Sequence, residues 1–299
     1  MKRNWQPARK EGTWKIRYYQ VGYTCEKVKY RVPDQIAKNA ELTRRHIARQ
    51  ERSPGQGMRQ IQRTVNANFY RTSGWLLTLE YSDGQIARLK GKLPDDLSAE
   101  DTRAQMRQLV EHEAELWARR VRRARKQAGA EFKYFIVTSD LDGKTGEIVR
   151  WHHHVICDLD CLADAIEKWK HGEVDYKQLW DEPDHNDLVA YLLKQVQVKA
   201  DEKRYTPSRN LIHPAPIREV TCRTDAELRV PAGCSLLERA AFSRFEPQYI
   251  RYTKPVGMIF AEEEEEEDGI QTHSFNQSAG MEARGTVLPP QGVSGDAKR

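Results

Sequence analysis

The chain has 299 residues, of which 38% are hydrophobic and 31% charged, and a formal net charge of +5. This length fits one large domain or two small ones. No run of roughly 18 or more apolar residues is present, which excludes a membrane-spanning segment, and no apolar stretch follows the basic N-terminus as in a secretion signal. Five cysteines without framework-like spacing indicate reduced thiols and hence a cytoplasmic protein.

Charge is unevenly distributed along the chain. Residues 1–63 contain 16 Lys and Arg against 5 Asp and Glu, whereas residues 261–299 contain 3 against 9. The composition predicts a basic, partly ordered N-terminal region over 1–63, a folded domain over 64–260 and a disordered acidic and polar tail over 261–299. A basic arm on a neutral domain suits a polyanion such as nucleic acid, although charge alone is equally consistent with a role in solubility.

The predicted elements mix hairpins with helices. Apolar runs closed by turn residues predict strands, and apolar residues three and four positions apart predict helices. Because strands and helices do not alternate regularly, the pattern favours an α+β fold with an antiparallel sheet. In chain order we expect a hairpin over 14–32, a buried strand over 74–81, a helix capped by Ser98, a hairpin of strands over 132–138 and 147–157, and a helix over 187–198.

Basic residues gather at two places in the middle region. The second half of the helix after Ser98 carries six Lys and Arg within eight positions, 119–126. Cations stabilise the C-terminal end of a helix, but six exceed what that effect needs. An extended basic loop follows the last predicted helix. We therefore expect nucleic-acid contacts from the helix and the loop, through Arg119, Arg120, Arg122, Arg123, Arg204 and Arg209.

A histidine triplet lies in the predicted strand over 147–157. Alternate side chains of a strand face the same way, so His152 and His154 project together while His153 points to the other face. Two imidazoles on one face can hold a divalent cation and leave coordination positions open for substrate. The triplet therefore predicts a metal site, with a chance surface cluster as the alternative.

A hard cation also needs oxygen ligands, so we expect a carboxylate near the two histidines. Folding the hairpin about its glycine-containing turn brings residues 137–140 opposite His152, and Asp140 is the nearest acid there. Glu147 on the returning strand and Glu80 near the end of the strand over 74–81 remain alternatives. A bulge or a change of register decides which face each acid takes.

A candidate nucleophile lies in the last predicted helix. Tyr191 and Lys194 are three positions apart and therefore share a face. An ammonium beside a phenol favours the phenolate or stabilises charge on a leaving group, which suits phosphoryl transfer. A core tyrosine among apolar neighbours is the alternative, and the histidines upstream favour the nucleophile.

The order of these motifs resembles that of the HUH endonucleases. The resemblance is to the single-tyrosine replication initiators of rolling-circle plasmids and phages, including the group related to the filamentous-phage gene II protein. It covers about residues 64 to 255. The matching stretches are 66–69 with 76–81 for the first motif, 150–156 for the second, and 191–194 with 204–211 for the third.

The resemblance implies roles for individual residues. His152 and His154 would ligate Mg²⁺ or Mn²⁺. Tyr191 would attack a phosphodiester, leaving a 5′-phosphotyrosine link and a free 3′-OH that primes synthesis, and Lys194 would help to place the phosphate. The implied fold is an antiparallel sheet of about five strands flanked by helices. The chain departs from the pattern at His153, where the family name implies a hydrophobic residue, and at Asp140, where relatives commonly have Glu.

The implied partner is single-stranded DNA at a replication origin, in the cytoplasm of a bacterial host. Residues 143–145 resemble the end of a phosphate-binding loop, but the glycine needed five residues earlier is Thr138. We therefore expect no ATPase and a dependence on a host helicase and polymerase. The alternatives are a relaxase or transposase with the same chemistry, and a non-catalytic nucleic-acid-binding protein.

Overall fold

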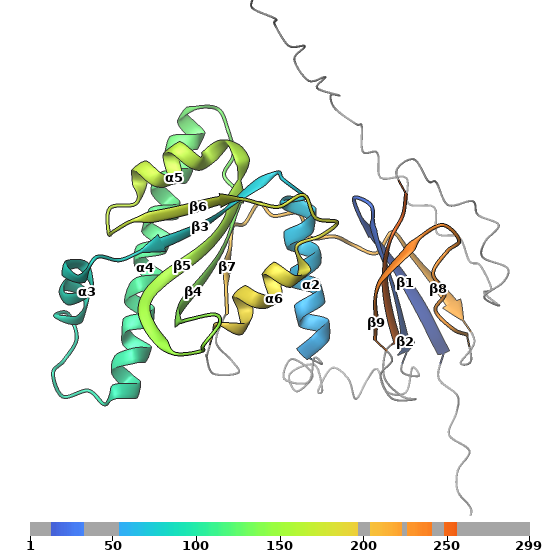
Figure 1. Ribbon diagram of the computed structural model, residues 1–299, viewed down its shortest axis with the longest axis horizontal. Helices are drawn as coiled ribbons and strands as arrows, with labels where there is room; N and C mark the ends of the chain where they lie inside the picture. Colours follow the sequence, from blue (N-terminus) through green and yellow to red (C-terminus); the bar gives the residue numbers. More distant parts are fainter. Residues whose placement is uncertain (1–12, 33–53, 197–203, 223–225, 241–247, 256–299) are drawn as a thin grey trace, which may run out of the picture.

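The computed structural model describes five segments of the chain and confirms the predicted α+β class in them, with two antiparallel sheets where the sequence predicted one. Two antiparallel five-stranded sheets and five α-helices form (Figure 1). None of these helices is both long enough and apolar enough to cross a membrane. The basic stretches 1–12 and 33–53 and the tail over 261–299 lie outside the described residues. The described residues are 13–32, 54–196, 204–222, 226–240 and 248–255.

The first sheet, sheet A, joins the two ends of the described chain. Its strand order is β8-β1-β2-β10-β9, and neighbouring strands are antiparallel. The predicted N-terminal hairpin is confirmed as β1 and β2. Its turn contains Gly22 at φ 58°, where a Cβ would lie 2.4 Å from the ring of Tyr70. The strands are β1 Thr13–Val21, β2 Thr24–Val32, β8 Arg218–Cys222, β9 Ser235–Ala240 and β10 Gln248–Thr253.

Sheet A does not follow the predicted boundary between residues 63 and 64. That boundary assigned β8, β9 and β10 to the same domain as the histidine triplet, whereas β8 and β10 pair with β1 and β2. The Lys15–Glu219 ion pair within this sheet joins residues 204 positions apart. Local patterns predict strands but not distant partners, because pairing is decided by packing and chain closure rather than by sequence neighbours.

The second sheet, sheet B, carries the histidine triplet on its middle strand. Its order is β6-β3-β5-β4-β7. The predicted strand over 74–81 is confirmed as β3, and the predicted hairpin is confirmed as β4 and β5. In the turn of that hairpin, a carboxylate oxygen of Asp142 accepts hydrogen bonds from the backbone N–H groups of Lys144 and Thr145. The strands are β3 Gly74–Glu80, β4 Tyr134–Leu141, β5 Ile148–Asp158, β6 Val174–Gln178 and β7 Thr206–Pro207.

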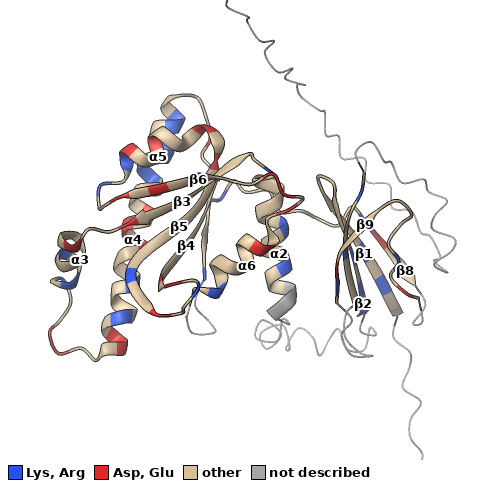
Figure 2. Ribbon diagram, in the orientation of Figure 1, with Lys and Arg blue, Asp and Glu red and all other residues tan. Residues whose placement is uncertain are grey.

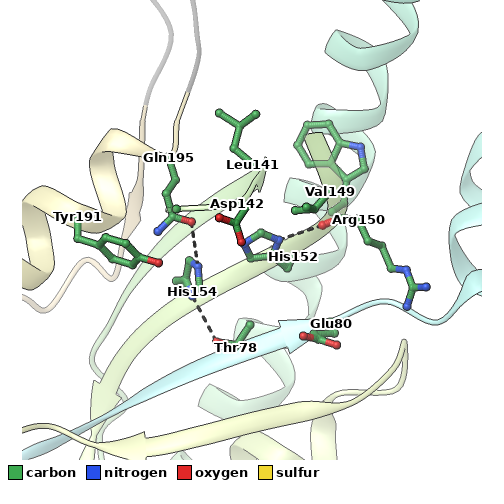
Figure 3. Close-up of a pocket in the computed structure, with 12 residues that line it drawn as sticks. Thr78, Glu80, Leu141, Asp142, Val149, Arg150, His152, His154, Tyr191 and Gln195 are labelled. Carbon is green, nitrogen blue, oxygen red and sulfur yellow. Dashed lines mark hydrogen bonds between the residues drawn. The ribbon is translucent and has the colours of Figure 1, made fainter. Parts of the chain in front are cut away.

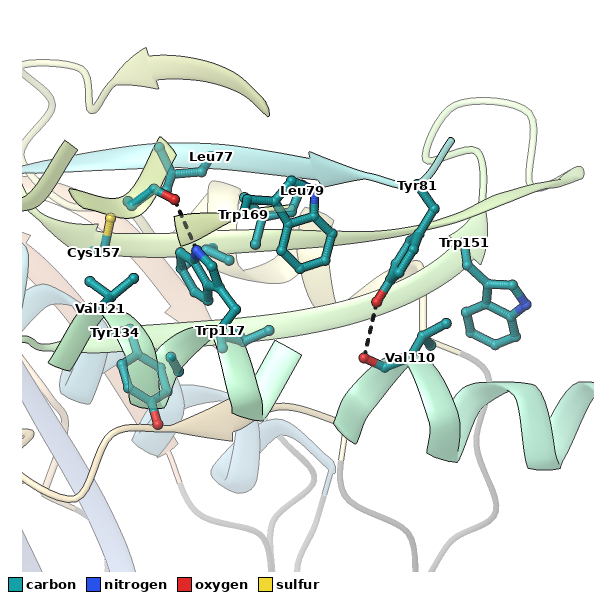
Figure 4. Packing of buried hydrophobic residues seen from close by; sticks show 14 of the residues in the cluster. Leu77, Leu79, Tyr81, Val110, Trp117, Val121, Tyr134, Trp151, Cys157 and Trp169 are labelled. Carbon is teal, nitrogen blue, oxygen red and sulfur yellow. Dashed lines mark hydrogen bonds between the residues drawn. The ribbon is translucent and has the colours of Figure 1, made fainter. Parts of the chain in front are cut away.

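One face of sheet B is covered by α3, α4 and α5. Ser98 caps α4 as predicted, since its hydroxyl accepts a hydrogen bond from the backbone N–H of Asp101 at 3.1 Å. Val110, Trp117 and Val121 of α4 pack into an apolar cluster with residues of β3, β4 and β5 (Figure 4). These helices are α3 Asp83–Lys90, α4 Ala99–Gln127 and α5 Leu162–Lys168.

The opposite face of sheet B is partly covered by α2, Pro54–Asn68, and α6, Asn186–Lys194 (Figure 1). The buried side chains of Val65, Val189 and Leu192 pack there against residues of β4 and β5. Apolar residues three and four positions apart give α6 one buried side, as its sequence predicts. The other side of α6, which carries Tyr191, faces a pocket next to sheet B.

Candidate active site

The three consecutive histidines of β5 have different surroundings because the strand alternates. His153 is fully buried on the α4 face, where its two ring nitrogens lie 2.9 Å from the hydroxyls of Thr138 and Tyr81. Burial, together with the neighbouring histidines, lowers the pKa of His153 to about 3. This imidazole is therefore neutral and belongs to the core. The predicted separation of His153 from His152 and His154 is confirmed.

The side chains of His152 and His154, here called the histidine pair, open into a pocket of about 280 Å³ on the α6 side of the sheet (Figure 3). Their ring centroids lie 4.8 Å apart. The Nδ1–H of His152 can donate to the backbone carbonyl of Arg150 at 2.9 Å, which leaves a lone pair on Nε2. Burial lowers the pKa of His154 to about 4, so this ring is neutral, the form that binds a metal.

The acid that lies beside the histidine pair is Glu80, not Asp140. Glu80 of β3 pairs directly with His152 of β5, and it lines the pocket together with Asp142. Asp140 instead receives two hydrogen bonds from the guanidinium of Arg103 on α4, at 2.7 and 2.8 Å. The prediction that favoured Asp140 is thus not supported by the structure. Its neighbour in the sequence pairs with His152, so alternation turns Asp140 towards α4.

Glu147, the other acid considered from the sequence, is exposed in the turn before β5 and does not line the pocket. Its carboxylate accepts a hydrogen bond from the hydroxyl of Thr145 at 3.3 Å. Among the acids weighed from the sequence, only Glu80 therefore shares the pocket with the histidine pair.

The carboxamide of Gln195, the residue that follows α6, adds a neutral oxygen that the sequence analysis missed. Oε1 of Gln195 lies 3.3 Å from Nε2 of His154, and Nδ1 of the same ring lies 3.3 Å from the hydroxyl of Thr78. Gln195 is four positions after Tyr191, and this spacing on one helix face could have revealed it. Its Nε2 is buried and makes no hydrogen bond within the described structure.

The donor set fits a hard divalent cation in type. Nε2 of His154 and Oε1 of Gln195 lie 3.3 Å apart, so one cation could take both as ligands. The carboxylate and carboxamide oxygens suit Mg²⁺ or Mn²⁺, and the two imidazoles add nitrogen ligands. Within the described part of the chain, no three His, Cys, Asp or Glu side chains are already gathered at metal-binding distances. Binding would therefore require side-chain rotation of Glu80 or Asp142 towards the pair.

Tyr191 lies at the mouth of the same pocket, opposite the histidine pair (Figure 3). Its side chain is 42% exposed, in contrast to the buried Leu192 and Leu193 that follow it. The ring rests against the turn of the β4–β5 hairpin, where a Cβ on Gly143 would lie 2.2 Å from the phenol oxygen. A glycine at this point of the turn therefore allows the phenol its present position.

Lys194 is not brought to the pocket. It is exposed at the end of α6 and is not among the lining residues, whereas Gln195, one position further, is. The permanently charged side chain that does line the pocket is Arg150, whose guanidinium lies 2.7 Å from the carboxylate of Asp83. On a helix, a residue four positions on is rotated less from the starting residue than one three positions on, which explains the difference.

The basic cluster of α4 lies on the face of sheet B away from the pocket (Figure 2). Arg119 pairs with Glu115 at 3.5 Å, and Arg122 donates to the hydroxyl of Tyr134 at 3.0 Å. Arg120 is half-buried and Arg123 is exposed. A nucleic-acid strand bound at the pocket would therefore not contact this basic cluster directly. Arg204 and Arg209 are exposed on either side of β7, at the edge of sheet B.

Comparison of the chain with protein-family models, with curated proteins and with solved structures found no significant match.

Proposed function

We propose that the chain is a metal-dependent endonuclease that nicks single-stranded DNA through Tyr191 and so starts rolling-circle replication. The observation that carries the proposal is the shared pocket of Tyr191 and the histidine pair. These residues come from a helix and a strand that are about 40 positions apart in the sequence. A half-exposed phenol opposite two imidazoles is an arrangement suited to attack on a phosphodiester.

In the proposed reaction the phenol of Tyr191 loses its proton and its oxygen forms a bond to phosphorus. The bond between phosphorus and the 3′ oxygen breaks, and that oxygen takes up a proton to become a free 3′-OH. The 5′ side stays linked as a phosphotyrosine ester. One ester is exchanged for another without water, so the reverse attack by a 3′-OH can religate the strand.

The histidine pair, Glu80 and Gln195 are the residues that would hold Mg²⁺ or Mn²⁺. When bound, such a cation supplies Lewis-acid stabilisation of the charge that develops on the phosphate. His152 is oriented for this role by its hydrogen bond to the carbonyl of Arg150, which fixes the tautomer. The guanidinium of Arg150 adds positive charge to the same wall of the pocket. Lys194, which the resemblance assigns to placing the attacked phosphate, does not line the pocket, and that role stays a prediction.

The test is a cleavage assay on single-stranded oligonucleotides with Mn²⁺, followed by denaturing electrophoresis. We expect a shortened strand with a free 3′-OH and a protein band shifted by attached DNA, both lost with EDTA. Tyr191→Phe should lose cleavage and the attached DNA while it keeps DNA binding. Tyr176→Phe, which removes the hydroxyl of an exposed tyrosine on β6, is the matched control. Cleavage by Tyr191→Phe at the wild-type rate would refute the proposal.

A relaxase or transposase would share this chemistry and differ in the fate of the 3′-OH. Extension of the nicked 3′ end on a circular template by a host polymerase, with a host helicase, distinguishes an initiator from both. A non-catalytic binding protein would behave identically with Tyr191 and with Phe at that position. The two assays together therefore separate all three alternatives.

A further inference from the structure

Strand β6 is an edge strand of sheet B, and most of its side chains are exposed. Thr78 of β3 pairs with His154 on one side and with Asp175 of β6 on the other. Two positions along, Leu76 pairs with Lys177. Because directly paired residues share a face, Asp175 and Lys177 lie on the same face as the histidine pair. Both are exposed, so this half of the face is accessible from the pocket.

A half-exposed tryptophan follows at the end of β6. Trp180 is 51% exposed, although the residue before it, Leu179, is buried in the cluster beneath α2 and α6. Nζ of Lys177 lies 4.3 Å from the centroid of the Trp180 ring, within the range of a cation–π interaction. This contact orients the indole and puts a positive charge next to it. The carboxylate that follows, Asp181, is paired with the guanidinium of Arg71.

An exposed indole beside an ammonium matches the two parts of a nucleotide. The flat ring can stack on a base of any sequence, and the ammonium can approach the adjoining phosphate. Lys177 is two strands and two residues from His154, which corresponds to roughly 10 Å across and 7 Å along the sheet. The Trp180 ring lies three residues further along the chain and 4.3 Å from the Lys177 ammonium, so a nucleic-acid strand of a few nucleotides could extend from the pocket to it.

We propose that Trp180 and Lys177 form a subsite that stacks one base of the single strand held at the pocket, a few nucleotides from the bond that is cut. This inference rests on the proposed function for the strand at the pocket. It adds a binding determinant on β6 that does not touch the reacting atoms. Trp180 supplies affinity by stacking and tolerates any base, while Lys177 contacts the backbone.

The test measures binding rather than cleavage. In a Tyr191→Phe background, the affinity for a labelled oligonucleotide is read by fluorescence anisotropy with Mn²⁺ present. Trp180→Ala should weaken binding about tenfold, because the stacking of one base on an aromatic side chain is lost, and Trp180→Phe should recover part of the loss. Tyr176→Ala is the matched control. Tyr176 is also 51% exposed on β6, but it packs against Trp75 on the opposite face.

A scan with single abasic positions then locates the stacked base. In the Tyr191→Phe protein, removal of one particular base should weaken binding about as much as Trp180→Ala does. In the protein that also carries Trp180→Ala, the same removal should have no further effect. Unchanged affinity of Trp180→Ala, or an equal loss in Tyr176→Ala, would overturn the subsite.

The cleavage assay with Tyr191 intact keeps the two proposals apart. A protein that binds in a Trp180-dependent way but never cuts would retain the subsite and refute the nickase. A protein that cuts with Trp180→Ala binding as tightly as wild type would retain the nickase and refute the subsite.

Discussion

Sheet A and sheet B are both five-stranded and antiparallel, yet they are held in the molecule by different forces. Helices pack on both faces of sheet B through two apolar clusters, and one of these faces is only partly covered. Sheet A meets α2 through charge instead. Arg63 pairs with Glu26 at 2.7 Å, Arg59 with Glu238 at 3.3 Å, and both guanidinium groups lie over tyrosine rings of sheet A.

The two kinds of contact have different consequences for the pocket: apolar packing forms the sheet that carries the histidine pair, and ion pairs orient the helix that carries Tyr191. Apolar packing is non-directional, so it stabilises sheet B without fixing contacts one by one. Buried ion pairs have a defined geometry, and removal of one partner destabilises the fold because it leaves the other charge buried without compensation. Arg251 of sheet A also pairs with Asp184, whose carboxylate accepts from the backbone N–H of Asn186 at the start of α6. Sheet A is thus tied to the beginning of the helix that carries Tyr191.

The largest expected effect concerns the histidines of sheet B. His154→Ala should lower the cleavage rate about 10³-fold, since a bound metal contributes several kcal/mol to the transition state. Its circular dichroism should stay that of the wild type. His153→Ala should instead lower the free energy of unfolding, because Tyr81 and Thr138 lose a buried partner. The reverse pattern would show that β5 presents the wrong face to the substrate.

The contact between sheet A and α2 comes next. Arg63→Ala should lower the free energy of unfolding by about 3 kcal/mol, because it leaves the carboxylate of Glu26 buried without its partner. Urea titration measures this loss. Arg119→Ala is the control: its ion pair with Glu115 is exposed, and the change should stay within about 0.5 kcal/mol. Equal small losses in both variants would mean that charge does not hold sheet A in place.

A third comparison sets two acids of sheet B against each other. Glu80→Gln should lower activity about 10- to 100-fold and raise the Mn²⁺ concentration needed for half-maximal rate, since it weakens a ligand of the proposed cation. Asp140→Asn should leave that concentration unchanged and cost about 1–2 kcal/mol of stability through its bond to Arg103. If Asp140→Asn raised the Mn²⁺ concentration needed for half-maximal rate and Glu80→Gln did not, Glu80 would be ruled out as the acidic ligand.

The smallest effect is expected at the turn against Tyr191. Gly143→Ala should slow cleavage about tenfold, or roughly 1.4 kcal/mol, because the added methyl group displaces the exposed phenol rather than the backbone. Gly84→Ala in α3, where an added Cβ meets nothing within 4 Å, should leave the rate unaltered. Thermal unfolding should change little in either variant. A wild-type rate for Gly143→Ala would indicate that the phenol moves during the reaction.

The sequence by itself determined the local features of this protein. Period-two alternation in β5 separated His153 from the histidine pair, turn residues marked the hairpins, and Ser98 marked the start of α4. Each of these follows from interactions between residues close in the chain, so a short window of sequence is enough to predict it.

Only the tertiary structure decided which residues meet across the chain. Cross-strand register put Glu80 beside His152 and turned Asp140 to Arg103, and the docking of α6 brought Gln195 rather than Lys194 into the pocket. The pairing of β1 with β8 joined segments about 200 residues apart. Such contacts depend on register, helix docking and chain closure, and a shift of one residue reverses the face that a strand presents.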